Sequence, residues 1–393
     1  MRGALKLGWR YLAYHRFKTA VLVAAVTLMI FLPAATRLLV TDSAAALTAR
    51  AAATPLLVGA RGSELELVLN ALYFHAERPP EIPHAVFEAV RGSGLAEAIP
   101  LYTRFQSRGS PIVGTSLDYF TFRGLELAEG RLMGLLGECV IGAGVARRHG
   151  VGAGGSLVSS PETVFDLAGV YPLKMKVTGV LEPAGTPDDE AVFVDLRTAW
   201  VIHGLGHGHQ DLEQAGARGA VLSRSEESIT ANASLVQYNE ITPDNVREFH
   251  FHGDTSGFPL SAVIAVPQDE KSGTLLRGRY RDEGVQEQLV VPYAVLGDLL
   301  ETVFTVQNYV VLGLVMLSLA TIAVITLVFL LSQQLRRGEF FTLRRMGASR
   351  GFIALLVASE ITFVFAGSLL LAAVMTWVVR AYATKFLLEL VTF

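Results

Sequence analysis

Residues 336–360 read RRGEFFTLRRMGASRGFIALLVASE, and this stretch determines how the chain is organised. Its first half is basic and its second half is largely apolar. Phe340, Leu343 and Met346 recur at three-residue spacing, which predicts a short helix with one apolar stripe between basic faces. Gly347 then predicts a turn, after which an apolar helix begins.

The apolar stripe on this short helix needs a surface that covers it. A groove on another protein could bury the stripe. Alternatively, the helix could lie on a lipid surface, with its arginines facing anionic headgroups. The residue pattern alone favours neither reading, so both stay open at this point.

Three apolar stretches flank the loop or lie far upstream of it, at residues 19–40, 303–332 and 352–380. Each is long enough to cross about 30 Å of hydrocarbon as a helix. Composition agrees, because 51% of the residues are hydrophobic and only 18% are charged, against about 25% charged in soluble domains. Backbone groups in lipid must be satisfied internally, so the three stretches are predicted to be transmembrane helices.

The first of these stretches also fits a secretory signal peptide. A basic region precedes it, and Pro33-Ala34-Ala35 could pass for a cleavage site. The apolar run, however, is longer than the usual core of a signal peptide. We therefore expect a retained membrane helix.

Basic residues in the short loops predict the orientation. Residues 1–18 contain five basic residues and no acid, which predicts a cytoplasmic, basic amphipathic segment. The loop 333–351 contains five arginines and a single acid, Glu339, and is also predicted to be cytoplasmic. The long segment 41–302 and the tail 381–393 are then extracytoplasmic.

The segment 41–302 has the pattern of a mixed α/β domain. Short β-branched or aromatic runs between Gly and Pro predict strands at Glu138–Ile141, Lys174–Leu181 and Ala191–Val194. Helical patterns occur at Pro83–Arg91 and at Val285–Thr305, and the second runs into the next apolar stretch. That helix could carry motion between compartments or simply pack on the domain. The predicted fold class is an α+β membrane protein with three transmembrane helices and this domain inserted between the first two.

The motifs of several enzyme classes are missing. There is no G-x-x-x-x-G-K-[ST] loop to hold nucleotide phosphates, so ATP would have to be hydrolysed by a partner chain. Neither G-x-S-x-G nor H-E-x-x-H occurs. The acidic run Pro187–Glu190 is typical of an exposed turn, and Gly150–Gly155 is also expected to be a turn. We predict a non-catalytic membrane subunit that binds no cofactor of its own, with zinc as the one possible ligand.

Histidines are concentrated in one part of the predicted domain. His203, His207 and His209 lie in the run VIHGLGHGHQD, and three imidazoles with an open fourth position can hold zinc. The intervening glycines favour a loop over a helix, and such a loop could fold around an ion or be merely solvated. His250 and His252 alternate as on one strand face. The predicted metal set is His203, His207 and His209.

The stretch at residues 336–360 resembles a loop of the FtsX-like, MacB-like ABC permeases. Their pattern is similar to R-x-E-[IF]-x-x-L-[RK]-x-[LM]-G-A-x-[RK]-x-x-[IL], followed by a glutamate and a glycine in the next helix. The matching residues here are Arg337, Glu339, Phe340, Leu343, Arg344, Met346, Gly347, Ala348, Arg350 and Ile353, then Glu360 and Gly367. The opening LGWRYLAYHRFKTAVLVAAV and the strand Val177–Leu181 also look like that family.

The resemblance implies a function and a set of partners. The chain would be a mechanotransmission permease in the bacterial inner membrane, a homodimer or a paired permease bound to an ABC ATPase that carries ATP and Mg²⁺. Glu339–Ala348 would be the coupling helix. A periplasmic or lipoprotein partner is possible, membrane lipids surround the helices, and no nucleic acid is expected. The cargo could be related to metal. The alternative is a membrane regulator that activates an extracytoplasmic enzyme such as a cell-wall hydrolase.

The C-terminal tail and the role of Glu360 are the two features that the resemblance does not explain. The family normally has a fourth membrane helix, whereas the tail 381–393 is too short to span, so either this branch uses three helices or the chain is truncated. Glu360, a carboxylate inside a predicted membrane helix, is a functional candidate by default. Because it lies near the loop arginines, we expect a structural ion pair with Arg344 or Arg345.

Overall fold

The structure is a computed structural model, which describes residues 2–160, 172–208, 221–224, 229–231, 239–281 and 284–391. The chain forms two compact units. One consists of residues 1–47 and 298–387, and the other of residues 48–297 and 388–393. The segment limits predicted from the sequence, with an extracytoplasmic part at 41–302, stay predictions.

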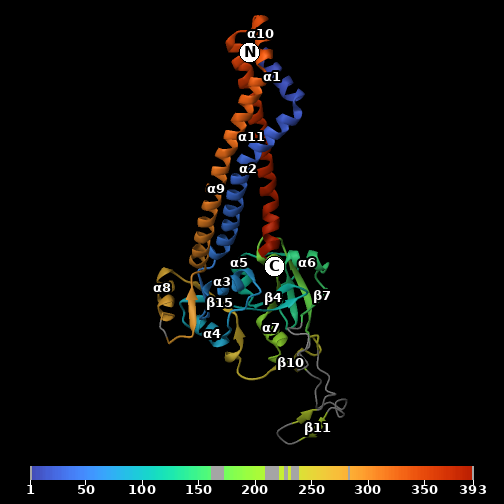
Figure 1. Ribbon diagram of the computed structural model, residues 1–393. Helices are drawn as coiled ribbons and strands as arrows, with labels where there is room; N and C mark the ends of the chain where they lie inside the picture. The colour runs from blue at the N-terminus through green and yellow to red at the C-terminus, as the bar shows by residue number, and fades with distance from the viewer. Residues whose placement is uncertain are drawn as a thin grey trace. The chain divides into compact units, whose positions relative to one another are not determined.

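The first unit is helical (Figure 1). Its helices are α1 (Arg2–Tyr14), α2 (Arg16–Ala52), α9 (Pro292–Leu335), α10 (Arg337–Arg345) and α11 (Arg350–Val391). Within the described residues, three helices are long and apolar enough to cross a membrane, judged by length and composition: α2, α9 and the part of α11 up to Tyr382. They contain the three apolar stretches found in the sequence.

The apolar side chains of α9 are mostly not covered by the rest of the chain. Leu312, Leu319 and Leu327 are 59%, 62% and 66% exposed. A row of exposed leucines this long would be unfavourable in water and is typical of a surface that meets lipid or another protein. A smaller cluster of Leu12, Leu22, Val26, Ile325 and Val364 packs α1, α2, α9 and α11 together. Close helix approach is supported by Ser368, whose Oγ donates to the Val23 carbonyl at 3.2 Å.

The second unit is built on one mixed sheet, in which ten strands pair among the described residues. The order is β16-β1-β15-β3-β4-β9-β6-β8-β5, with β7 paired to β8. The pairs β4–β9 and β6–β8 are parallel and the others are antiparallel. The strands are β1 (Leu56–Ala60), β3 (Ala96–Ser107), β4 (Ser110–Thr115), β5 (Leu127–Gly130), β6 (Glu138–Ile141), β7 (Ser156–Val158), β8 (Lys174–Leu181), β9 (Val192–Asp195), β15 (Ala262–Pro267) and β16 (Glu287–Val290).

Short helices and three small strand pairs complete this unit. The helices are α3 (Glu64–Tyr73), α4 (His84–Gly92), α5 (Asp118–Arg123), α6 (Ala143–His149), α7 (Leu196–His203) and α8 (Glu270–Arg279), with 3-10 turns η1 (Pro187–Glu190), η3 (Val246–Glu248) and η4 (Thr255–Gly257). The small pairs are β2 (Ile82–Pro83) with β14 (Pro259–Leu260), β10 (Gly206–Gly208) with β13 (Phe249–Phe251), and β11 (Val221–Arg224) with β12 (Ile229–Ala231).

The core lies between the sheet and helices α4 and α7. Val58, Tyr102 and Val194 from the sheet belong to the same buried cluster as Val90 of α4 and Trp200 of α7. Each fully buried side chain of valine size contributes about 1.5 to 3 kcal/mol to folding. The mixed α/β character predicted for this segment is confirmed by the sheet and its helices.

One predicted element is wrong in part. The helix expected from Val285 begins only at Pro292, because residues Glu287–Val290 form β16, which pairs with β1. Proline fits the first turn of a helix, where its missing N–H has no partner to lose. From Pro292 the helix continues to Leu335, so its expected continuity with the second apolar stretch is confirmed.

Candidate functional site

The loop between α9 and α11 contains the short helix α10, Arg337–Arg345. The helix ends at Arg345 with Met346 as its cap, and Gly347 follows, with a φ of 95° in the left-handed region that favours glycine. Met346 is 77% exposed and Phe341 is 57% exposed, whereas Phe340 and Leu343 are half-buried. The exposed large apolar residues of α10 and its C-terminal cap are therefore Phe341 and Met346.

Phe341 does not belong to the apolar stripe predicted from the sequence. The three-residue spacing includes Phe340 and leaves out its neighbour Phe341. Only the packing shows that Phe341 is the more exposed of the two phenylalanines. The Arg345 guanidinium carbon lies 4.5 Å from the centre of the Phe341 ring. The exposed face thus combines an aromatic ring, a thioether and a cation, which suits contact with a protein surface.

Arg336 joins α10 to α11 through an ion pair. Its Nη1 donates to both oxygens of Glu360 at 2.9 and 3.0 Å, and its Nε donates to Glu339 at 3.1 Å. Arg336 is 8% and Glu360 is 5% exposed, so this pair is buried. The guanidinium also lies 3.5 Å from the centre of the Tyr11 ring of α1.

The expected partner of Glu360, Arg344 or Arg345, is therefore wrong. Both of those arginines are exposed, and Arg345 lies over Phe341 instead. Arg336 stands at the junction of α9 and α10, where its side chain is enclosed and faces α11. The structural reading of Glu360 as half of an ion pair agrees with the geometry.

Lys18 extends these contacts to α2. Its ammonium group donates to the Ser332 hydroxyl in the last turn of α9, and it lies 5.9 Å from the centre of the Tyr11 ring. Together with Arg336, these contacts connect the base of α10 to four other helices.

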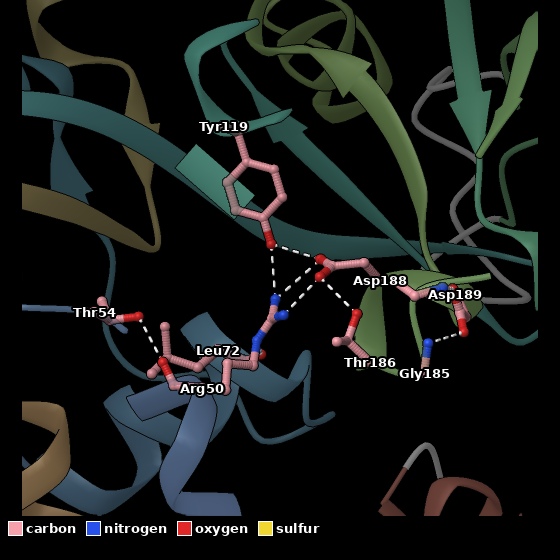
Figure 2. A network of polar contacts seen from close by, with 9 residues as sticks. Arg50, Thr54, Leu72, Tyr119, Gly185, Thr186, Asp188 and Asp189 are labelled. Atoms are coloured by element: carbon pink, nitrogen blue, oxygen red, sulfur yellow. Dashed lines mark hydrogen bonds and ion pairs between the residues drawn. The ribbon is translucent and has the colours of Figure 1, made fainter. Parts of the chain in front are cut away.

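The second unit has its own buried polar network, centred on Arg50 in the last turn of α2 (Figure 2). Arg50 Nη1 and Nη2 donate to the two oxygens of Asp188 at 2.6 and 2.9 Å. Nη2 also donates to the Tyr119 hydroxyl at 2.8 Å, and Nε donates to the Leu72 carbonyl. Tyr119 in turn donates to Asp188 at 2.7 Å.

Charge compensation dominates the electrostatics of this network. Burial raises the pKa of Asp188, but the Arg50 charge and the hydrogen bonds from Arg50 and Tyr119 outweigh it, so the pKa lies below its ordinary value. Burial also raises the pKa of the Tyr119 hydroxyl. Asp188 is therefore ionised and Tyr119 neutral at physiological pH, and each has the hydrogen-bonding role that the geometry requires.

The acidic run Pro187–Glu190 was expected to be an exposed turn, and that expectation is wrong. Asp188 is 1% and Asp189 8% exposed. Asp189 accepts the backbone N–H groups of Ala184 and Gly185, each at 2.8 Å, which fixes the preceding loop. The turn is buried because Arg50, distant in the sequence, neutralises it. In the sequence, the sign of such a partner is Arg50, a single arginine in the Ala-rich stretch that follows the first apolar segment.

The histidines of the predicted metal set do not all lie in the described part of the chain. His203 ends α7, and its Nδ1 is 2.8 Å from the Tyr102 hydroxyl. His207 lies in β10, and His209 falls outside the described residues. That set therefore stays a prediction. The structure groups His207 with His250 and His252 instead, with their ligand atoms within 4.8 Å of one another.

Comparison with known proteins gives one family match. Residues 20–238 match the model of the MacB-like periplasmic core domain. A search of curated proteins found no match. Among solved structures, the periplasmic region of MacB from Actinobacillus actinomycetemcomitans is 9% identical at a TM-score of 0.35, covering 63% of this chain and 92% of that one. The extracellular domain of the noncanonic ABC-type transporter YknZ from Gram-positive bacteria is 11% identical at a TM-score of 0.32, covering 60% of this chain and 98% of that one.

Proposed function

This chain belongs to the family of FtsX-like, MacB-like ABC transporter permeases that carry the MacB-like periplasmic core domain, and from that premise we propose that it works by mechanotransmission. A separate ATPase subunit hydrolyses ATP, and this chain converts the ATPase movement into movement of its periplasmic domain. The observation that carries the proposal is α10, with Phe341 and Met346 facing outward and a base fixed to neighbouring helices by the Arg336–Glu360 pair.

Two long helices support a mechanical role. Helix α2 carries Arg50 in its last turn, where it is bonded into the buried network of the second unit, and α9 begins in that unit at Pro292. Helix α9 runs without interruption from Pro292 to Leu335, whereas α2 contains Pro33, which removes one of its backbone hydrogen bonds. A continuous helix resists compression and bending better than a loop, so displacement at one end is delivered at the other.

The proposed orientation places α10 in the cytoplasm and the large domain in the periplasm of a bacterium, with the spans in the inner membrane. The charge distribution supports it, because the segments around α1 and α10 are rich in arginine and lysine. Exposed α10 would then meet the ATPase. The ATPase would supply the nucleotide site and Mg²⁺, and two permease chains, identical or related, would pair. A periplasmic or lipid-anchored protein is the proposed further partner.

Co-purification tests the coupling helix. We expect an ABC ATPase to purify with the wild-type chain and to be lost from the variant Phe341→Glu/Met346→Glu, because two charges would be buried in the proposed contact. The matched control is Leu117→Glu/Leu135→Glu, which places the same charges at leucines that are 50% and 51% exposed in the second unit. The control should keep the ATPase. Equal retention of the ATPase by both variants would show instead that α10 lies on the lipid surface.

A second assay distinguishes transport of a cargo from regulation of an extracytoplasmic enzyme. We propose export or extraction of cargo, measured as ATP-dependent movement or release by the reconstituted complex. If the complex moves no cargo, and its periplasmic domain binds and activates a cell-wall hydrolase, the chain is a regulator that uses the same coupling helix.

A further inference from the structure

The pair of strands β10 and β13 forms a small ribbon with two chemically different faces. The strands are antiparallel, with His207 opposite His250. One face is apolar: the rings of Phe249 and Phe251 lie on the glycines of β10, where a Cβ on Gly206 would come within 2.7 Å of the Phe251 ring. Only glycine allows this close approach. Both phenylalanines pack against the main core of the unit.

The other face of the ribbon carries three imidazoles. His250 and its cross-strand partner His207 lie on this face, and the ring of His252, the first residue after β13, packs beside both. The ring centroids of the three pairs are 4.9, 4.8 and 4.9 Å apart, which makes a nearly equilateral triangle. One ligand nitrogen from each ring lies within 4.8 Å of the others.

This triangle is close to the geometry of a metal site. Two nitrogens bound to one tetrahedral zinc ion lie about 3.3 Å apart, because each Zn–N bond is about 2.0 to 2.1 Å. The three ligand nitrogens lie within 4.8 Å of one another, so the widest pair would have to close by about 1.5 Å to reach that spacing. Three like-charged imidazolium rings would repel one another, whereas three neutral rings around a cation satisfy all their lone pairs.

A contact of His250 with the backbone supports this assignment. Its Nδ1 lies 3.1 Å from the Glu248 carbonyl oxygen, which can only accept. Nδ1 therefore carries the proton, and Nε2 holds the lone pair. A histidine that binds a metal usually has its other ring nitrogen hydrogen-bonded to a carbonyl or carboxylate in this way.

We propose that His207, His250 and His252 bind one divalent transition-metal ion, with zinc as the first choice, and leave a fourth position for water or an exchangeable ligand. Imidazole ligands suit zinc and its neighbours in the series. The open position and the exposure of His252 suit an ion that is taken up and passed on. This site lies wholly in the second unit and does not depend on the coupling role of α10.

Zinc titration of the full-length chain, purified in detergent without a histidine tag, tests the proposal. We expect one zinc ion per wild-type chain, measured by calorimetry and by competition with a chelating dye. His207→Ala/His250→Ala/His252→Ala should lose this ion. The single variant His252→Asn, at an exposed position, should weaken binding at least about 10-fold. Cobalt added in place of zinc should give visible absorption bands of a low-coordinate site in the wild type only.

The control variant is His203→Ala/His209→Ala, which removes the other two histidines of the set predicted from sequence. It should bind zinc like the wild type. The proposal is overturned if the triple variant binds zinc as tightly as the wild type, if the wild type binds none at micromolar zinc, or if the control variant loses the ion. Circular dichroism of each variant separates loss of ligands from loss of fold, and ATPase co-purification is expected to be unchanged in all of them.

Discussion

Arg50 and Asp188 show how one buried ion pair can tie a helix end into a domain. Both side chains are almost fully enclosed, at 6% and 1% exposure, and the carboxylate also accepts from Tyr119 and from the Thr186 hydroxyl. Taking charges out of water is costly, so such a pair is tolerated only when every polar atom has a partner. Removing either partner leaves an uncompensated charge in the core.

We therefore expect Arg50→Met to destabilise the second unit by about 3 to 5 kcal/mol. The matched control is Arg148→Met, which removes an arginine that pairs with Glu190 nearby but is 46% exposed. That change should cost less than about 1 kcal/mol. The measurement is denaturant unfolding of the purified chain, followed by tryptophan fluorescence. A similar cost for the two variants would contradict the structural role of Arg50.

The same carboxylate predicts a dependence on pH. The pKa of Asp188 is lowered from 3.8 in the folded chain, so its ionised form is favoured by folding. The stabilisation is then fully present above the ordinary carboxyl pKa and is lost as the pH falls through the lower folded value. We expect the thermal midpoints of wild type and Asp188→Asn to differ most at neutral pH. The difference should start to shrink only when the pH falls below about 4. A constant difference across this range would be inconsistent with an ionised Asp188.

At the scale of elements, the base of α10 contains a buried ion pair like that of Arg50 and Asp188. Arg336 and Glu360 hold α10 against α11, at 10% and 6% side-chain exposure. Such a pair fixes geometry more than it adds stability, since its desolvation offsets much of its attraction. A helix that transmits force needs a fixed base, so the pair belongs to the proposed coupling.

A double-mutant cycle measures this contact. We expect Arg336→Met and Glu360→Leu each to lower the free energy of unfolding by about 3 to 5 kcal/mol, seen as a lower thermal midpoint. The double variant should recover much of this loss. The exposed pair of Arg380 and Asp42, at 3.6 Å, gives the control Asp42→Asn, which should change little. Purely additive losses in the double variant would mean that the two residues do not interact.

The elements themselves were largely predictable from local patterns. Strands β6 and β8 begin and end where the short β-branched runs in the sequence predict them, because both runs are bounded by turn residues. The apolar stretches behave similarly, since length and composition suffice to identify them. Residues 285–291 were assigned to a helix because their pattern fits either class, and only the pairing of β16 with β1 decides it.

The contacts at the candidate sites were harder to predict than the elements, because their partners are distant in the sequence. The partner of Asp188 lies 138 residues away in the sequence, and Glu360 pairs with Arg336 and not with the arginines of α10. Likewise, His207 meets His250 only through the register of two short strands. Spacing along a chain gives no information on contacts of this kind, because they are set by tertiary packing. The residue types that matter were visible, whereas their partners were not.

At the scale of the whole molecule, the family match and the apolar helices support one functional arrangement. The chain is a membrane-associated permease with a MacB-like periplasmic domain, and the proposed arrangement places the ATPase contact on α10. Long helices then link that contact to the domain. The prediction at this scale is that nucleotide bound by the partner changes the position of the domain relative to the helices.

A distance measurement tests this claim most directly. Cys139, the single cysteine, is buried, so spin labels can be introduced at Tyr14→Cys, which is 82% exposed, and at Leu135→Cys in the second unit. In the reconstituted complex with its ATPase, we expect the distance distribution between the labels to shift when ATP replaces ADP. With Phe341→Glu/Met346→Glu added, the distribution should stay the same in both nucleotides. An unchanged distribution in the otherwise wild-type complex, with ATP hydrolysis intact, would contradict mechanotransmission by this chain.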